Sequence, residues 1–325
     1  MNLHLNKNLF QDAVRITAQQ MNIQPEFVEK NYWVTYALHA IFNNEIGNDT
    51  IFKGGTALSK CYKMIDRFSE DIDLVVLRRE GETDNKLKAK LKTIGNVVAE
   101  VLAEVEIATI THKVGMIRKT AHTYNKEFEG NYGQVRDVIV LESTWLGFYE
   151  PYTNRILHSF IGEMMINNGQ SDIAEANGLL PFEVRVLEPT RTLCEKIMSL
   201  VRFSYGENPM DDLKNKIRHT YDLHQLLQQK EFSDFFKSPA FDEMLVRVAT
   251  DDVASFRNNN KWLANHPNDA LIFRDLDVIW ERLKDTYNGD FRNLVYGDLP
   301  KEEAVLATLK IIKERLIIIT WNVKV

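Results

Sequence analysis

The sequence predicts an α+β protein, with a mixed sheet and helices in its N-terminal half and a mostly helical C-terminal half. Apolar residues recur at helical spacing over residues 8–43. Short runs typical of strands follow between residues 50 and 148, and strand signals become rare after about residue 165. We therefore expect two domains, residues 1–170 and residues 171–325.

The first half alternates between the two element types. Residues 8–43 are expected to form two helices, the second beginning near Pro25. A short strand at residues 50–53 ends at Gly54 and Gly55, and a helix over residues 56–65 and a strand over residues 72–77 follow. The next expected elements are a helix at 84–106 opening with Asp84, strands within 107–148, including 135–141, and turns at Gly115, Gly130 and Gly133.

The second half has few strand signals. Residues 180–187 predict one short strand, and Glu188 and Pro189 then introduce a helix over residues 190–203. Another helix is expected up to residue 227, and residues 231–325 are mostly helical around a turn-rich interruption at 258–269. The apolar stretch 304–321 contains four charged residues, too many for a membrane span, and is predicted to be a docking helix.

Composition limits the class of protein. The chain has 44% hydrophobic and 26% charged residues, as soluble globular proteins do, and it opens without a signal-peptide pattern. Its two cysteines, Cys61 and Cys194, fit neither a disulfide framework nor a metal-ligand spacing, which favours the cytoplasm. A net charge of −6 means that any nucleic-acid contact requires a local basic patch. The candidates are Arg185, Arg191, Lys196, Arg202, Lys214, Lys216 and Arg218.

Two aspartates carry the main chemical signal. Asp71 and Asp73 are two residues apart on a predicted strand, so both side chains point to the same face. Neighbouring carboxylates repel each other unless a cation neutralises them, and their oxygens suit Mg²⁺ or Mn²⁺. Alone, such a pair is most often a solvated strand face.

A glycine pair precedes these aspartates. Gly54 and Gly55 lie between a strand and a helix, where backbone without side chains can approach a phosphate closely. Alone, such a pair is usually a simple turn. In the order strand, glycine pair, helix, aspartate pair, the two motifs predict a site for a metal-bound triphosphate. Hydroxyls and cations that would contact its phosphates are Thr56, Ser59, Lys60 and Arg67.

This order resembles the signature of DNA polymerase β-like nucleotidyltransferases. The fuller strings, Gly-Gly-Thr-Ala-Leu-Ser-Lys from Gly54 and Arg-Phe-Ser-Glu-Asp-Ile-Asp-Leu from Arg67, resemble one branch closely. That branch is the AbiEii/AbiGii nucleotidyl transferase toxin family of bacterial toxin–antitoxin and phage-defence systems. The resemblance covers roughly residues 10–230 and adds Ser69 to the expected nucleotide contacts.

The resemblance also implies residues in the second half. A lysine that the family has on a helix corresponds to Lys196. Lys196 lies at the edge of an apolar stripe, and from this position alone its side chain could equally reach into a cleft or extend to solvent. An Arg-x-x-Tyr-Asp-Leu-like segment corresponds to residues 218–223 and makes Asp222 an active-site residue, although Arg218 and Asp222 alone read as a surface ion pair. Superfamily members usually have a third acidic residue, here Glu142 or, less favoured, Asp137.

The resemblance implies transfer of a nucleoside monophosphate from an NTP to a hydroxyl acceptor. Residues 1–170 would be the nucleotidyltransferase core, and residues 171–325 would complete the active-site cleft. The expected partners are the NTP, an RNA acceptor such as the 3′ end of tRNA, and a cognate antitoxin, with no membrane. Two alternatives stay open: modification of a protein or small molecule, and a non-catalytic nucleotide-binding module acting through a partner. The NTP, the acceptor, the oligomeric state and the role of residues 231–325 are not encoded in any motif.

Overall fold

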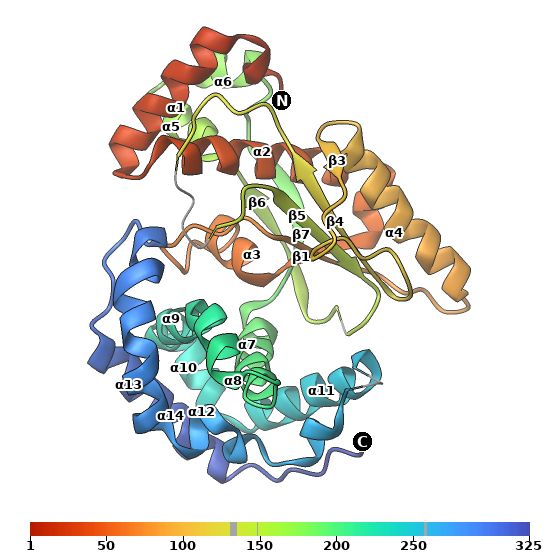
Figure 1. The fold of residues 1–325 in the computed structure, drawn as a ribbon. Helices are drawn as coiled ribbons and strands as arrows, with labels where there is room; N and C mark the ends of the chain where they lie inside the picture. The colour runs from red at the N-terminus through yellow and green to blue at the C-terminus, as the bar shows by residue number, and fades with distance from the viewer. Residues whose placement is uncertain (131–134, 148, 257–258) are drawn as a thin grey trace. The chain divides into compact units, whose positions relative to one another are not determined.

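A seven-stranded mixed sheet and fourteen α-helices make up the described part of the chain, which confirms the predicted α+β class (Figure 1). The structure is a computed structural model that describes residues 1–130, 135–147, 149–256 and 259–325. The turn expected at Gly133, part of the strand-rich region and residue 258 of the expected interruption lie outside the described residues. The strands are β1 (Thr50–Lys53), β2 (Ile72–Val76), β3 (Ala103–Val105), β4 (Ile117–Thr123), β5 (Ile139–Thr144), β6 (Tyr152–Leu157) and β7 (Phe182–Leu187).

The chain folds into two compact units. Unit 1 contains Met1–Lys63, Phe68–Trp145 and Tyr152–Val186, and unit 2 contains Met64–Arg67, Leu146–Pro151 and Leu187–Val325. Residues 171–186, expected in the second domain, thus belong to unit 1 as α6 and most of β7. The division into functional domains at residue 170 stays a prediction.

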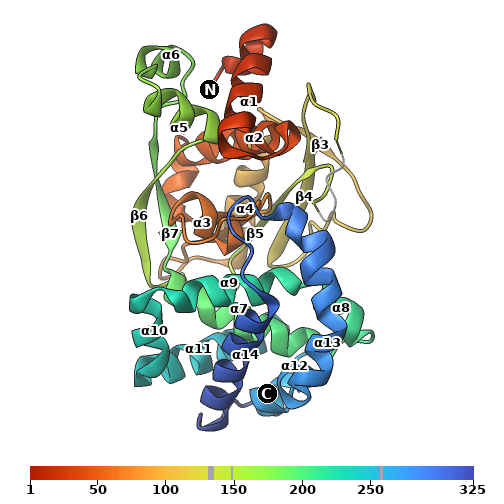
Figure 2. The same ribbon diagram turned by 90° about the vertical axis from the view of Figure 1, so that its left-hand side faces the viewer.

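The sheet of unit 1 has the strand order β3-β4-β5-β2-β1-β7-β6. At its centre, β2 pairs with β1 antiparallel and with β5 parallel, while β7 pairs with β1 in parallel. Ile72, Leu74 and Val76 of β2 are fully buried, so the strand that follows Asp71 and contains Asp73 is held in the core. Figure 2 shows β7 and β6 at one side of this sheet.

One helix of unit 1, α2, is buried along nearly its whole length and packs against α1, α4 and α5. Even its charged Glu29 and Lys30 have no exposed surface. The side chain of Asn31 accepts a hydrogen bond from the Phe160 backbone N–H at 3.0 Å, which ties α2 to the start of α5. The α-helices of unit 1 are α1 (Lys7–Met21), α2 (Pro25–Phe42), α3 (Gly54–Lys60), α4 (Asp84–Ala99), α5 (Phe160–Asn167) and α6 (Ser171–Ala176).

Two helix boundaries differ from the sequence prediction. Helix α3 begins at Gly54 itself and ends at Lys60, whereas the sequence predicts residues 56–65. Helix α4 ends at Ala99 because residues 103–105, predicted as its last turn, pair with β4 as strand β3. Its capping side chain belongs to Thr83, which accepts from the Lys86 N–H, and not to Asp84. For α4, strand pairing and the Thr83 side chain decide boundaries that apolar spacing leaves open.

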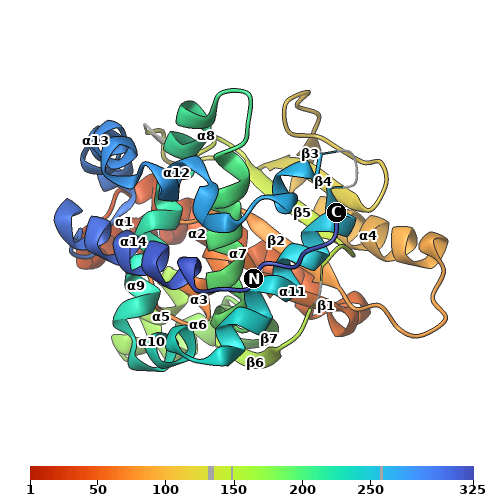
Figure 3. The ribbon, with the colours of Figure 1, turned by 90° about the horizontal axis from the view of Figure 1, so that it is seen from below.

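Unit 2 is helical, and α7 packs against α8, α9, α10, α11 and α12 (Figure 3). The C-terminal α14 forms the helix expected within the apolar stretch, buries Val305, Leu309, Ile312 and Leu316, and packs on α9 and α13. The α-helices of unit 2 are α7 (Pro189–Phe203), α8 (Pro209–Asn215), α9 (Ile217–Gln228), α10 (Lys230–Lys237), α11 (Pro239–Ser255), α12 (Leu271–Arg274), α13 (Leu276–Thr286) and α14 (Glu302–Ile317).

Across the described residues, no helix has the length and apolar character needed to cross a membrane.

Candidate active site

The first glycine of the pair is in direct contact with an aspartate. Gly54 has a φ of +80°, which disfavours other residue types, and a Cβ placed on it would lie 2.3 Å from Oδ2 of Asp73. The register explains this proximity, since Lys53 of β1 lies opposite Asp73 of β2. The glycine therefore allows the Asp73 carboxylate to lie against the backbone at the start of α3.

Gly54→Ala is expected to lower nucleotidyl transfer about a hundredfold, because the new methyl group would displace the Asp73 carboxylate. The measurement is kcat/KM with labelled NTP. Gly81→Ala is the matched control, since Gly81 has a φ of +77° but no neighbouring atom within 4 Å. Equal losses in both variants would mean that backbone strain alone, and not the displacement of Asp73, limits the reaction.

Four charged residues form one row across neighbouring strands. Lys53 pairs in register with Asp73, Asp73 with Glu142 of β5, and Glu142 with Lys119 of β4. The Lys119 ammonium is 3.1 Å from the Glu142 carboxylate. The two carboxylates at the centre of the row are thus adjacent, with a lysine on each outer side. Asp137, the other candidate for a third carboxylate, is 66% exposed and pairs with Lys126.

The surroundings of Asp73 disfavour its charged form. Burial and the negative charges of Glu142 and Asp71 raise the pKa of Asp73 to about 7, although Lys53 and Lys119 act in the opposite direction. Burial is the larger cause, and a cation bound at Asp73 would favour its charged form.

Thr56 and Ser69 hold the segment that leads into β2. The Thr56 hydroxyl donates to the backbone carbonyl of Asp71 at 2.6 Å and lies 2.9 Å from the Ser69 hydroxyl. Thr56 is buried, so in this arrangement its hydroxyl fixes the backbone of Asp71. Of the other predicted contacts on α3, Gly55 and Ser59 are partly exposed.

An arginine that no sequence motif indicates lies on the first aspartate. Nη1 of Arg136 is 3.0 Å from Oδ1 and 3.4 Å from Oδ2 of Asp71. The backbone carbonyl of Arg136 accepts a hydrogen bond from the Lys30 ammonium. Nothing in the spacing or type of residues around position 136 distinguishes this arginine from a surface arginine.

Lys60 lies in the interior of unit 1. Its ammonium donates to the Thr35 hydroxyl at 2.7 Å and lies 5.5 Å from the centre of the Phe160 ring. Only 6% of the residue is exposed, and burial lowers the pKa of Lys60 to about 7. The ammonium points into the core, and the phosphate contact of Lys60 stays a prediction.

Lys60→Met is expected to leave the KM for NTP unchanged and to alter the pH dependence of stability. A lysine whose pKa is about 7 in the folded chain and about 10.5 when unfolded makes the folded chain more stable as pH rises from 7 towards 10. The methionine variant should lack this rise in urea unfolding between pH 7 and pH 9. A higher KM in this variant would instead support the phosphate contact.

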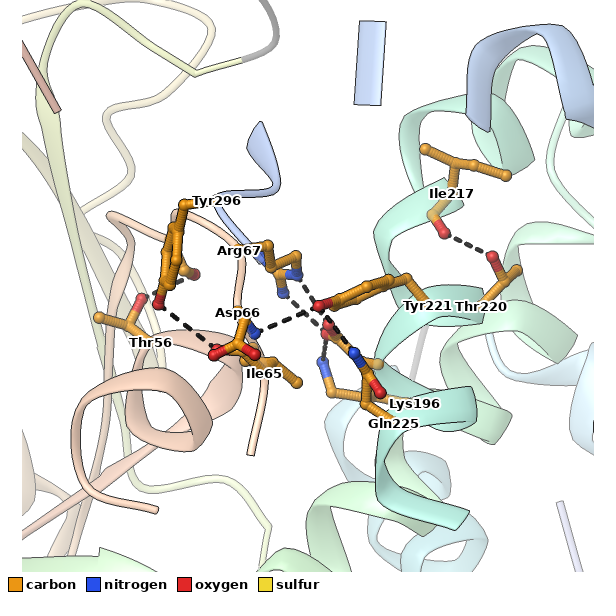
Figure 4. Close-up of polar contacts among 12 residues, drawn as sticks. Thr56, Ile65, Asp66, Arg67, Lys196, Ile217, Thr220, Tyr221, Gln225 and Tyr296 are labelled. Atoms are coloured by element: carbon orange, nitrogen blue, oxygen red, sulfur yellow. Dashed lines mark hydrogen bonds and ion pairs between the residues drawn. The ribbon is translucent and has the colours of Figure 1, made fainter. Parts of the chain in front are cut away.

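In unit 2, Asp222 binds two buried cations, Arg67 and Lys196, both of which are labelled in Figure 4. Its carboxylate accepts from Nε and Nη2 of Arg67, both at 2.7 Å, and from Nζ of Lys196 at 2.6 Å. Arg67 and Asp222 are at most 1% exposed, and Lys196 is 5% exposed. Arg67 was predicted to contact phosphate, but its bidentate fork is used on Asp222 because the folded chain buries both groups together.

The charges in this cluster shift each other's protonation in different directions. Burial alone would raise the pKa of Asp222, but Arg67 and Lys196 outweigh it and lower the pKa to about 2. Burial lowers the pKa of Lys196, and Asp222 counteracts this effect. Lys196 and Asp222, each predicted from the family resemblance, are thus joined by a direct hydrogen bond.

The backbone beside Arg67 is also held within unit 2. The Asp66 N–H donates to the Tyr221 hydroxyl at 3.2 Å, and the Asp66 carbonyl accepts from the Tyr296 N–H at 3.0 Å (Figure 4). Tyr221 comes from α9, one residue before Asp222. The short segment Met64–Arg67 is therefore fixed by two separate parts of the chain, of which sequence motifs indicated only α9.

The predicted site residues form two clusters. The first, in unit 1, unites Asp71, Asp73, Glu142, Gly54, Thr56 and Ser69. The second, in unit 2, unites Arg67, Lys196 and Asp222. Two of the seven basic residues proposed as an RNA patch, Arg191 and Lys196, are buried, and Arg191 is bonded to Asp251 and Glu195.

The donor set of the first cluster suits a hard divalent cation. Asp71, Asp73 and Glu142 supply carboxylate oxygens, the ligands that such a cation prefers. However, no three His, Cys, Asp or Glu side chains in the described ranges are arranged closely enough to hold a metal ion together. Asp71 and Glu142 are instead bonded to Arg136 and Lys119. The residues present fit Mg²⁺ chemically, in an arrangement that requires a side-chain movement.

The mixed sheet, with Gly54 directly against the Asp73 carboxylate, has the arrangement expected of the nucleotidyltransferase class. Comparison with protein families agrees, because the model for "Nucleotidyl transferase AbiEii toxin, Type IV TA system" matches residues 36–309. The chain belongs to this AbiEii family of type IV toxin–antitoxin systems and is therefore an EC 2.7.7-type enzyme. Membership of the family implies an NTP as its substrate and a cognate antitoxin as its partner. A search of curated proteins finds no significant match.

Proposed function

We propose that the chain is the metal-dependent toxin of its system and transfers an NMP from an NTP to an RNA hydroxyl, with the 3′ end of tRNA as acceptor. The observation that supports this most directly is the contact between Asp73 and Gly54, with Glu142 in register beside Asp73. This contact supports the proposal because it brings a carboxylate next to the glycine backbone that we propose binds the phosphates. We propose the cytoplasm as the compartment, since NTP and tRNA are found there.

In the proposed reaction, the acceptor hydroxyl oxygen forms a bond to the α-phosphorus of the NTP. The bond from that phosphorus to the bridging oxygen breaks, pyrophosphate leaves, and the hydroxyl proton is released to solvent. Mg²⁺ or Mn²⁺ held by Asp71 and Asp73, with Glu142 as third carboxylate, would supply charge neutralisation and lower the pKa of the hydroxyl. Positioning supplies most of the remaining rate.

Several of the predicted site residues have a defined part in this proposal. The backbone of Gly54 and Gly55 and the Ser59 hydroxyl would bind the β- and γ-phosphates, and Thr56 with Ser69 would position Asp71 through the hydrogen bonds described above. Lys196 is the proposed cation that stabilises charge on the triphosphate, and its hydrogen bond to Asp222 supports Asp222 as the group that orients it.

The test is incubation of the purified chain with each labelled NTP, Mg²⁺ and total bacterial RNA. We expect label in the tRNA fraction from the wild-type chain and none from the Asp73→Asn variant. Label on protein or on a small molecule would mean that this molecule, and not RNA, is the acceptor. No label with any acceptor or metal would mean that the chain binds nucleotide without catalysing transfer. Growth arrest by the wild-type chain, absent in Asp73→Asn, tests the toxin role.

A further inference from the structure

The guanidinium of Arg136 forms an ion pair with Asp71, a carboxylate that the proposed function assigns to a metal ion. It contacts both oxygens of Asp71, at 3.0 and 3.4 Å, through the single nitrogen Nη1. Both side chains belong to unit 1 and reach solvent, with 41% of Arg136 and 22% of Asp71 exposed. A cation that neutralises Asp71 in this way competes with any divalent ion for the same oxygens.

The backbone of Arg136 is fixed, but its side chain is not enclosed. The Lys30 ammonium donates to the Arg136 carbonyl, and the Arg136 N–H donates to the Glu70 carboxylate at 3.4 Å. Lys30 and Glu70 are both buried, so this peptide has a defined position beside Asp71. The exposed guanidinium can therefore rotate away from Asp71 without a change in the backbone.

Arginine has more donors than Asp71 uses. Within the described residues, Nε and Nη2 of Arg136 make no hydrogen bond, whereas Nη1 bonds to Asp71. Arginine binds phosphate through two parallel N–H groups, a geometry that a lysine lacks. The fork of Arg136 is thus able to bind a phosphate close to the aspartate pair.

We propose that Arg136 is the counterion of Asp71 in the metal-free enzyme and transfers to a phosphate of the NTP when the divalent ion binds. This proposal rests on the proposed function of Asp71 and Asp73. It assigns two roles to the Arg136 side chain. In the absence of nucleotide, Arg136 weakens metal binding, and once the divalent ion is bound, it strengthens nucleotide binding. By thermodynamic reciprocity, NTP and the divalent ion then favour each other's binding.

The first measurement is Mn²⁺ binding to the nucleotide-free chain, followed by the electron paramagnetic resonance signal of free Mn²⁺. Arg136→Gln is expected to bind Mn²⁺ about fivefold more tightly than wild type, the size of effect that partly exposed ion pairs have. Arg79→Gln is the matched control, because Arg79 is also exposed, belongs to unit 1 and pairs with Asp49. Its Mn²⁺ affinity should equal that of wild type.

The second measurement is binding of an α,β-methylene NTP analogue at saturating Mg²⁺. Arg136→Gln should weaken this binding about tenfold. Arg136→Lys should restore the weak Mn²⁺ binding of wild type but not the analogue affinity, because it keeps the charge and loses the fork. Unchanged or weaker Mn²⁺ binding by Arg136→Gln would overturn the exchange. If Asp71→Asn/Asp73→Asn binds Mn²⁺ as wild type does, the proposed metal site itself is wrong.

Discussion

Asp73→Asn is expected to lower nucleotidyl transfer at least about a thousandfold, a loss typical of removing a group that stabilises charge in the transition state. Asparagine has the same shape, so contact with Gly54 is preserved while the negative charge disappears. Steady-state rates with each labelled NTP and the RNA acceptor provide the measurement.

Stability distinguishes loss of chemistry from loss of fold in this variant. Asp73 lies beside Asp71 and Glu142, and their mutual repulsion is removed by the amide. The free energy of unfolding should therefore not fall by more than about 1 kcal/mol. Asp137→Asn is the control, because this carboxylate is exposed and paired with Lys126, and it should retain full activity. Activity within tenfold of wild type in Asp73→Asn would exclude Asp73 as a catalytic carboxylate.

Asp222→Asn is expected to destabilise unit 2 by about 3–5 kcal/mol, the range found when one partner of a buried ion pair is removed. Asp222 is fully buried and accepts three hydrogen bonds from Arg67 and Lys196. Without its charge, Arg67 and Lys196 stay buried and lose this counterion. Urea unfolding followed by tryptophan fluorescence measures the loss.

Two further variants and a pH titration identify the cause of that loss. Asp234→Asn removes an exposed carboxylate paired with Lys230 in the same unit and should leave the free energy of unfolding unchanged. Adding Lys196→Met to Asp222→Asn should recover part of the stability, because one buried charge disappears. A double variant less stable than Asp222→Asn would contradict this account.

The sign of the pH effect follows from the lowered pKa of Asp222. Its pKa is about 2 in the folded chain and about 3.8 in the unfolded chain, so its stabilising contribution is complete above pH 4. The contribution is lost as pH falls from about 4 to 2, and Asp222→Asn should show a smaller loss over this range.

The two predicted strands near the aspartates agree with the structure because their signals are local. Residues 50–53 form β1 as expected, and β2 spans Ile72–Val76 where the sequence predicts residues 72–77. By contrast, β3 falls within a predicted helix, since Ala103–Val105 become a strand only by pairing with β4. Pairing partners far away in the chain leave no mark on apolar spacing.

The sequence alone determined the family, because the strings that begin at Gly54 and Arg67 are local and the family comparison agrees with them. The phosphate-binding turn at Gly54 and the metal-binding pair Asp71 and Asp73 are predictions from the same local geometry.

Only the tertiary structure decided which partners the basic side chains contact. Arg67, predicted to contact phosphate, binds Asp222, and Lys60 lies in the core, while Arg136, which no motif marks, lies on Asp71. The physical reason is that a charge acts on whatever lies within a few ångströms of it. Long flexible side chains reach partners that folding, and not sequence spacing, brings near.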